Sequence, residues 1–262
     1  MGENSRIEWT HHTFNPWRGC SAVSEGCRFC YAETLAKRFP AIHGTWGVNG
    51  RRVVASEAMW RQPLKWDRDA AKAGERRRVF CASMADVFER LPDGHPDKEA
   101  IVCAFVRLRD TIKETPALDW LLLTKRPENV NLFLSGSVWP RNAWLGVSVE
   151  NQEMADKRIP ILLDLKRYYD IPVAFLSVEP MLGAVRLPPD YLALGKGGWC
   201  IVGGESGAKA RPMEWPWAGD LFRQCRDSGV PFFMKQFSSH GGYPHKDFAG
   251  FPGTLQVREF PR

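Results

Sequence analysis

Six short apolar runs recur along the sequence, and more polar stretches separate them. Each run has four to six residues of nearly continuous apolar character. This pattern is typical of strands that are buried on both faces, as in a parallel sheet. The runs cover residues 79–83, 120–124, 143–148, 173–178, 199–203 and 231–235.

Helical patterns lie between these runs. The apolar residues at positions 101, 105, 108 and 112 recur at spacings of four, three and four, which places them on one face of a helix. A second helix is predicted to open at Pro127, and a third covers residues 151–165, where Pro160 is expected to kink or split it. A fourth helix, around residues 221–225, is expected to end near Gly229.

Strands that alternate with helices indicate right-handed βαβ units. With a first strand near residues 13–17, the chain has six or seven strands. We therefore predict an α/β fold, a partial or complete (β/α) barrel of parallel strands; an open doubly wound sheet is the alternative. The barrel domain is assigned to residues 1–236, and residues 237–262 are assigned to a C-terminal tail that packs on the barrel.

Polar or charged residues follow each of the six runs, at the point where the predicted strand ends. In barrel enzymes, the carboxyl ends of the strands form the face that carries the active site. A polar pocket on this face is one interpretation, and simple exposure of the strand ends to solvent is the other. The residues concerned are Ser83, Asp86, Lys125, Arg126, Ser148, Glu150, Glu179, Glu205 and Lys235.

The composition sets broad limits on the class of protein. The 262 residues are 44% hydrophobic, which is enough for one core of barrel size. The net charge of +6 permits contact with nucleic acid without requiring it, and the basic residues 51–52 and 76–78 form either a solvated face or a site for a phosphate backbone. The start of the chain is polar, and no apolar run reaches the roughly 18 residues that span a bilayer. We expect a cytoplasmic, reduced protein that does not bind a membrane.

Three of the seven cysteines are clustered, at Cys20, Cys27 and Cys30, with the spacing C-x6-C-x2-C. In a reduced compartment, such a cluster indicates metal ligands or redox groups rather than disulfides. Three thiolates leave one coordination position open, which suits an iron–sulfur cluster that takes part in chemistry. A zinc site of three cysteines with His11 or His12 as fourth ligand, or unligated thiols, are the alternatives.

The cysteine segment resembles the radical S-adenosylmethionine superfamily, whose usual spacing is C-x3-C-x2-C. This chain keeps the second half of that motif and has a longer first gap. More narrowly, the whole chain resembles a phage and bacterial three-cysteine-motif family. The matching segments are residues 14–20 (FNPWRGC), 123–127 (LTKRP), 146–150 (GVSVE), 177–180 (SVEP), 202–207 (VGGESG) and 233–236 (FMKQ).

The resemblance implies two cofactors, a [4Fe–4S] cluster on the three cysteines and S-adenosylmethionine, together with an external electron donor. In the superfamily, the open iron binds S-adenosylmethionine, and one electron releases a 5′-deoxyadenosyl radical that abstracts hydrogen from the substrate. By strand order, Ser83 and Asp86 are candidates for the methionyl amine, and Lys125 or Arg126 for its carboxylate. Ser148 and Glu150 are candidates for the ribose, and Glu205 for a hydroxyl or amine of the ligand.

Glu179 and Lys235 are the candidate catalytic residues, and we expect them to contact the substrate. The basic charge and the phage association of similar proteins favour a nucleic acid or nucleotide as substrate, for modification or lesion repair. The alternative function is a non-catalytic nucleic-acid-binding protein that carries zinc or an iron–sulfur cluster.

Overall fold

A computed structural model describes residues 2–134, 138–240 and 245–261 of the chain. The strands are β1 (His12–Thr13), β2 (Trp17–Arg18), β3 (Val53–Val54), β4 (Arg77–Cys81), β5 (Leu118–Thr124), β6 (Ala143–Ser148), β7 (Ala174–Val178), β8 (Gly198–Gly203) and β9 (Phe232–Gln236). The α-helices are α1 (Tyr31–Arg38), α2 (Pro40–His43), α3 (Glu57–Trp60), α4 (Gln62–Ala73), α5 (Lys98–Glu114), α6 (Val130–Leu134), α7 (Gln152–Tyr169), α8 (Pro189–Leu192) and α9 (Trp215–Ser228). Short 3-10 helices are η1 (Glu25–Cys27), η2 (Pro127–Asn129), η3 (Gly195–Gly197), η4 (Phe248–Gly250) and η5 (Gly253–Leu255).

Seven strands form one sheet in the order β1-β4-β5-β6-β7-β8-β9. The pairings described for β1 with β4, β4 with β5, and β6 through β9 are all parallel. Each new strand is added beside the previous one, which is the topology of a (β/α) barrel and excludes a doubly wound sheet, where the order reverses. Among the described residues, β1 and β9 remain the two edges. The α/β prediction is confirmed in its partial-barrel form.

The first strand differs from its prediction over residues 13–17. Two separate strands occupy this part of the chain: β1 pairs with β4, and β2 pairs antiparallel with β3 in a small second sheet. Asn15 and Pro16 lie between them, and proline cannot donate to a ladder. The Asn15 side chain instead accepts the backbone N–H of Met84 at 2.8 Å, which ties this bend to the end of β4.

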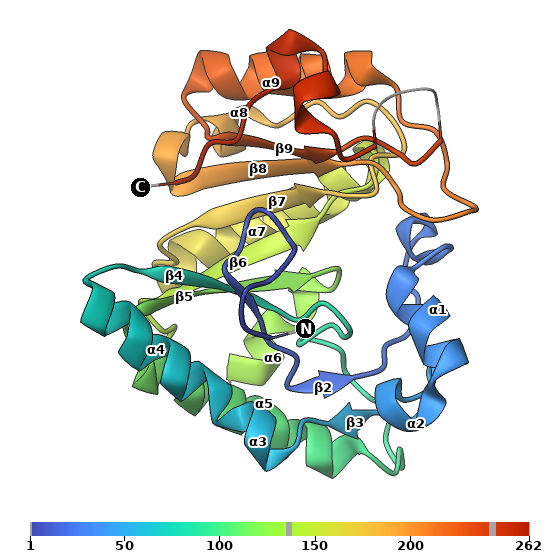
Figure 1. The fold of residues 1–262 in the computed structure, drawn as a ribbon, viewed down its shortest axis with the longest axis vertical. Helices are drawn as coiled ribbons and strands as arrows, with labels where there is room; N and C mark the ends of the chain where they lie inside the picture. Colours follow the sequence, from blue (N-terminus) through green and yellow to red (C-terminus); the bar gives the residue numbers. More distant parts are fainter. Residues whose placement is uncertain (1, 135–137, 241–244, 262) are drawn as a thin grey trace. The chain divides into compact units, whose positions relative to one another are not determined.

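The chain divides into two compact units, each described by itself. The first contains Met1–Val23 and Cys30–Trp144, and the second contains Ser24–Phe29 and Leu145–Arg262. In the first unit, α4 packs against β4 and β5, and α5 packs against α4 (Figure 1). Its core includes Phe14, which packs edge-on against Trp60 and Trp120 with ring centroids 5.0 and 5.7 Å apart. The predicted stripe of α5 is buried at positions 101, 105, 108 and 112.

In the second unit, β7 and β8 are buried along their whole length. The helix predicted over residues 151–165 is longer, and it is not split at Pro160, which lies on the exposed side. Gly229 ends α9 in the left-handed conformation, as predicted. From the tail, Arg258 forms an antiparallel bridge with Phe233, and the N–H of Glu259 donates to the carbonyl of Phe232. Residues 241–244 and 262 of the predicted tail lie outside the described residues.

Candidate functional site

The three clustered cysteines lie in the loop between β2 and α1. Cys20 follows β2, Cys27 ends η1, and Cys30 directly precedes α1. None of the three forms a disulfide in the described part of the chain, and all have intermediate exposure. Cys20 and Cys30 belong to the first unit, and Cys27 belongs to the second. Among the described residues, no group of three or more His, Cys, Asp or Glu side chains is arranged to hold a metal ion.

Arg126 is the cation beside Cys20 in the first unit. Its Nη1 lies 3.7 Å from the Cys20 sulfur, and its Nη2 donates to the carbonyl and the hydroxyl of Ser21 at 2.8 and 2.9 Å. Burial of the thiol, with Glu89 and Asp86 nearby, raises the pKa of Cys20 to about 12, and Arg126 opposes this rise. The free thiol is therefore protonated at neutral pH.

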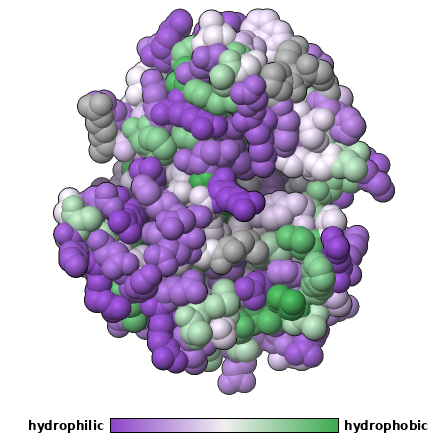
Figure 2. All heavy atoms as spheres, in the orientation of Figure 1, coloured by the Kyte–Doolittle hydropathy of each residue, from purple (hydrophilic) through white to green (hydrophobic). Residues whose placement is uncertain are grey.

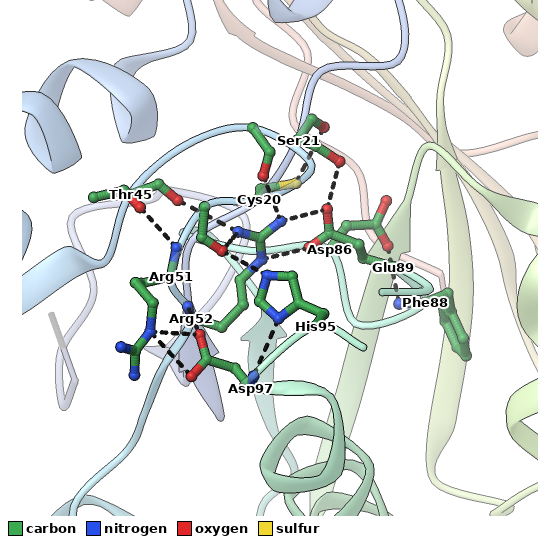
Figure 3. Close-up of polar contacts among 12 residues, drawn as sticks. Cys20, Ser21, Thr45, Arg51, Arg52, Asp86, Phe88, Glu89, His95 and Asp97 are labelled. Carbon is green, nitrogen blue, oxygen red and sulfur yellow. Dashed lines mark hydrogen bonds and ion pairs between the residues drawn. The ribbon is translucent and has the colours of Figure 1, made fainter. Parts of the chain in front are cut away.

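A buried ionic network surrounds this contact in the first unit. Arg52 is fully buried and forms a bidentate pair with Glu89, at 2.8 and 2.9 Å. Arg126 contacts both Asp86, at 3.0 Å, and Glu89, at 3.4 Å. Figure 3 shows Arg52 and Glu89 among the neighbouring polar side chains of Asp86, His95 and Asp97. Because each buried charge has an opposite partner, the network avoids the cost of an unpaired ion.

The predicted ligand-binding residue Asp86 lies at the centre of this network. One carboxylate oxygen accepts from the Thr124 hydroxyl at 2.7 Å and from the N–H of Phe88 at 3.0 Å. The other accepts from the N–H of Lys125 and from Arg126, both at 3.0 Å. These hydrogen bonds fix the carboxyl end of β5. Asp86 therefore stabilises the fold at this strand end without any ligand.

Ser83, predicted to act with Asp86, is tied to the bend after β1. Its hydroxyl accepts from the Asn15 amide at 3.1 Å, and its carbonyl accepts from the Tyr31 hydroxyl at 2.5 Å. Tyr31 is the first residue of α1, directly after Cys30. Within the first unit, Ser83 is therefore connected through one residue to the third cysteine.

The segment that carries Cys27 is held in the second unit by Glu150. The Ser24 hydroxyl donates to Glu150 at 2.9 Å, and Glu150 is also paired with Arg158 at 2.8 Å. Both charged side chains are almost fully buried, at 1% and 3% exposure for Glu150 and Arg158. Gly26 lies so close that a Cβ there would be 2.3 Å from Glu150 Cγ. The sequence singled out Glu150 but not Arg158 or this packing.

Arg211 makes the second attachment of the same segment. It forms hydrogen bonds to both oxygens of Glu205 and an ion pair with Glu25 at 2.8 Å. Its guanidinium also lies over the ring of Phe29, 5.2 Å from the centroid. The hydrogen bonds that Arg211 donates to Glu205 raise the pKa of Arg211. Glu205, predicted as a ligand contact, thus orients the arginine that holds the cysteine segment.

The remaining predicted site residues also lie in the second unit. Lys235 on β9 donates to Glu179, which directly follows β7, and both side chains are largely buried. They meet across β8, where Gly203 leaves room: a Cβ there would lie 3.2 Å from the Glu179 carboxyl carbon. Ser148 is buried at the end of β6, and its carbonyl accepts from Arg158 at 2.8 Å. The structure therefore brings Glu179 and Lys235 together and places Ser148 beside the Glu150–Arg158 pair.

The basic run at residues 76–78 does not form a bare cationic surface. Arg76 pairs with Asp119 at 2.7 Å, and Arg77 pairs with Glu75 at 2.7 Å. Arg78 donates to the carbonyl of Trp9 at 3.1 Å. The visible face in Figure 2 is mostly hydrophilic, with apolar side chains over the part that α1 and α2 occupy in Figure 1. Local carboxylates therefore balance the charge of two of the three arginines.

The fold and the site define the chain as an α/β protein with a partial (β/α) barrel and a three-cysteine loop between β2 and α1. A family model matches residues 4–250, and the chain belongs to that family, DUF5131, whose description is "protein of unknown function". A search of curated proteins found no match. Within the described part of the chain, no helix combines the length and apolar character needed to cross a membrane.

Three similar solved structures are variants of spore photoproduct lyase. Two carry a cysteine-to-alanine substitution, one of them with a dinucleoside spore photoproduct, and the third carries a tyrosine-to-phenylalanine substitution. In each case the identity is 14%, the TM-score is 0.47, and the match covers 89% of this chain. The match covers 58% of those chains, so this chain spans less than two thirds of their length.

Proposed function

We propose that the protein is a radical S-adenosylmethionine enzyme whose [4Fe–4S] cluster is held by Cys20, Cys27 and Cys30. The observation that carries the proposal is the C-x6-C-x2-C run of three cysteines, none of which is disulfide-bonded in the described part of the chain. The donor set fits the cluster, because sulfur ligands suit iron and three of them leave one iron open. When bound, the cluster supplies the electron that cleaves S-adenosylmethionine and starts radical chemistry.

The histidines considered as a fourth zinc ligand have other contacts in the first unit. His11 Nδ1 accepts the N–H of Arg78 at 2.8 Å. His12 is buried, and its ring stacks on Trp66. These contacts favour the cluster over a zinc site with three cysteines and one histidine.

The chain's own residues have two tasks in this proposal. Arg126 and Glu150 fix the loop segments that carry Cys20 and Cys27. The polar side chains at the strand ends then contact S-adenosylmethionine. Each of the carboxylates among them would bind the ligand while it stays paired with its arginine. The proposed contacts are Ser83, Asp86 and Lys125 in the first unit, and Ser148, Glu150 and Glu205 in the second.

Glu179 and Lys235 are the proposed catalytic pair. A largely buried lysine that donates to a carboxylate can hold a proton or orient a hydroxyl of the substrate. We propose a nucleic acid or nucleotide as substrate, for modification or lesion repair, because the net charge is +6. We also propose an external electron donor, because each reductive cleavage of S-adenosylmethionine consumes one electron.

The proposal is tested by anaerobic reconstitution of the full chain with iron and sulfide. We expect about four irons per chain, visible absorption that dithionite bleaches, and loss of both in Cys27→Ala. Cys103→Ala is the matched control, because Cys103 is exposed on α5, away from the motif. Stoichiometric zinc without iron, or a wild-type spectrum in Cys27→Ala, would refute the proposal.

The substrate class is tested separately on the reconstituted protein. Reduced protein is incubated with S-adenosylmethionine alone or with DNA, RNA or free nucleotides, and 5′-deoxyadenosine is measured. We expect one of these additions to increase the yield. An identical yield in all arms would refute the nucleic-acid substrate while leaving the enzyme class intact, and no 5′-deoxyadenosine in any arm would refute the class.

A further inference from the structure

Arg126 holds the start of the cysteine loop at three atoms. Its guanidinium donates to the Ser21 carbonyl at 2.8 Å and to the Ser21 hydroxyl at 2.9 Å, and it lies 3.7 Å from the Cys20 sulfur. All of these residues belong to the first unit. One side chain therefore sets both the path of the loop and the charge next to its first sulfur.

The guanidinium is itself held rigidly. Asp86 contacts it at 3.0 Å and Glu89 at 3.4 Å, and only 8% of the Arg126 side chain is exposed. The backbone N–H of Arg126 donates to the Thr124 hydroxyl at 2.9 Å, which fixes the residue at the end of β5. An arginine with two carboxylate partners keeps its fork geometry without a further loss of side-chain entropy.

We propose that Arg126 is a positioning residue that holds Cys20 for the cluster and raises the cluster's reduction potential. This inference rests on the proposed function, since it requires Cys20 to be a ligand. Reduction adds negative charge to a cluster, and a cation or an N–H donor beside a ligand sulfur stabilises the reduced form more than the oxidised form.

Arg52 offers a matched control in the same network. It pairs with the same acid, Glu89, and it is more deeply buried than Arg126. Its other donors go to different targets, the carbonyls of Gly50 at 2.6 Å and Gly47 at 3.1 Å. Loss of Arg52 therefore disturbs the buried charges without removing a bond to Cys20 or Ser21.

The test compares full-length wild type, Arg126→Lys and Arg52→Lys, each reconstituted anaerobically, without S-adenosylmethionine. We expect Arg126→Lys to shift the midpoint potential in the negative direction and to lose iron to a chelator about tenfold faster. Hydrogen exchange of the unreconstituted protein should be faster at residues 20–23 in this variant. Arg52→Lys should keep the wild-type potential and the wild-type exchange at residues 20–23, even where its melting temperature falls.

An unchanged potential in folded Arg126→Lys, or an equal shift in Arg52→Lys, would overturn the inference. If Arg126→Lys does not fold, Ser21→Ala takes its place, because it removes the hydroxyl that Arg126 holds without changing any charge. Faster hydrogen exchange at residues 20–23 and faster loss of iron to the chelator are expected, and wild-type values of both count against the inference. Absence of a cluster in the wild type would instead overturn the proposed function, so the two failures are distinguishable.

Discussion

The imidazole of His12 stacks on the indole of Trp66, with the ring centroids 4.5 Å apart and an angle of 7° between the ring planes. His12 belongs to β1 and Trp66 to α4, so the stack joins the sheet of the first unit to a covering helix. Only 1% of His12 is exposed, and among the described residues neither ring nitrogen has a hydrogen-bond partner. A charged ring at this place would be poorly solvated.

The stack predicts loss of stability in acid. Burial, with Arg77 and His11 nearby, lowers the pKa of His12 from 6.5 to about 4. In the unfolded chain the ring takes up its proton at the ordinary pKa, so acid favours unfolding. The contribution of His12 to stability is complete above about pH 6.5 and is lost as the pH falls toward 4. The loss in the free energy of unfolding is about 2 kcal/mol at about pH 5. Urea unfolding between neutral and acidic pH measures it.

Two variants separate His12 from the other acid-sensitive groups. His12→Phe keeps a stacked aromatic ring without a titrating nitrogen, so its free energy of unfolding should fall less steeply below about pH 6.5 than that of the wild type. The exposed His240 serves as control, and His240→Asn should follow the wild-type curve. The explanation fails if His12→Phe and the wild type lose stability in parallel.

The same substitution at two arginines of α7 should destabilise the protein by very different amounts. Arg158 is buried against Glu150, whereas Arg167 pairs with Asp164 at the surface, with 69% of its side chain exposed. Arg158→Met removes the buried cation that pairs with Glu150 and should cost about 3–5 kcal/mol. Arg167→Met should cost about 0–1 kcal/mol. Urea denaturation followed by circular dichroism compares them, and equal costs would contradict the buried pair.

Close packing of the Cys27 segment predicts an effect of a single methyl group. In Gly26→Ala the new Cβ would lie 2.3 Å from Glu150 Cγ, so the segment must shift, at a cost of about 1–3 kcal/mol. Because Cys27 is the next residue, iron uptake should fall together with the melting temperature. Gly253→Ala is the control, since nothing lies within 4 Å of a Cβ there. Wild-type iron uptake in Gly26→Ala would show that the segment does not depend on this contact.

Much of the sheet could be predicted because buried parallel strands are almost entirely apolar. The six predicted runs correspond to β4 through β9, with ends that differ by a few residues. The strands β2 and β3 were not predicted, because a segment of two residues, such as Val53–Val54, is too short to show an alternation of apolar and polar positions. The helix α4 was also missed, although its buried Pro63, Trp66 and Ala70 have helical spacing.

The candidate site was predictable only for residues that belong to a local pattern. Cys20, Cys27 and Cys30 are close in sequence, and Glu150 follows a strand. The arginines that pair with acids around the cysteine loop carry no local sequence signal. Arg52 is 37 residues from its partner Glu89, and Arg211 is 186 residues from its partner Glu25. The need of each buried carboxylate for a cation is general, but the tertiary fold decides which arginine meets it.

The Glu179–Lys235 pair gives the last prediction, which concerns the proposed reaction. Lys235→Met removes the cation that meets Glu179 across Gly203, so a proton held by this pair would be lost. We expect the part of 5′-deoxyadenosine formation that depends on the nucleic acid or nucleotide to fall about a hundredfold or more. The basal yield without substrate should persist, because Lys235 is not a proposed contact of either cofactor. Lys196→Met, at an exposed lysine of the same unit, should match the wild type. Substrate-dependent turnover at the wild-type rate in Lys235→Met would remove the pair from the catalytic site.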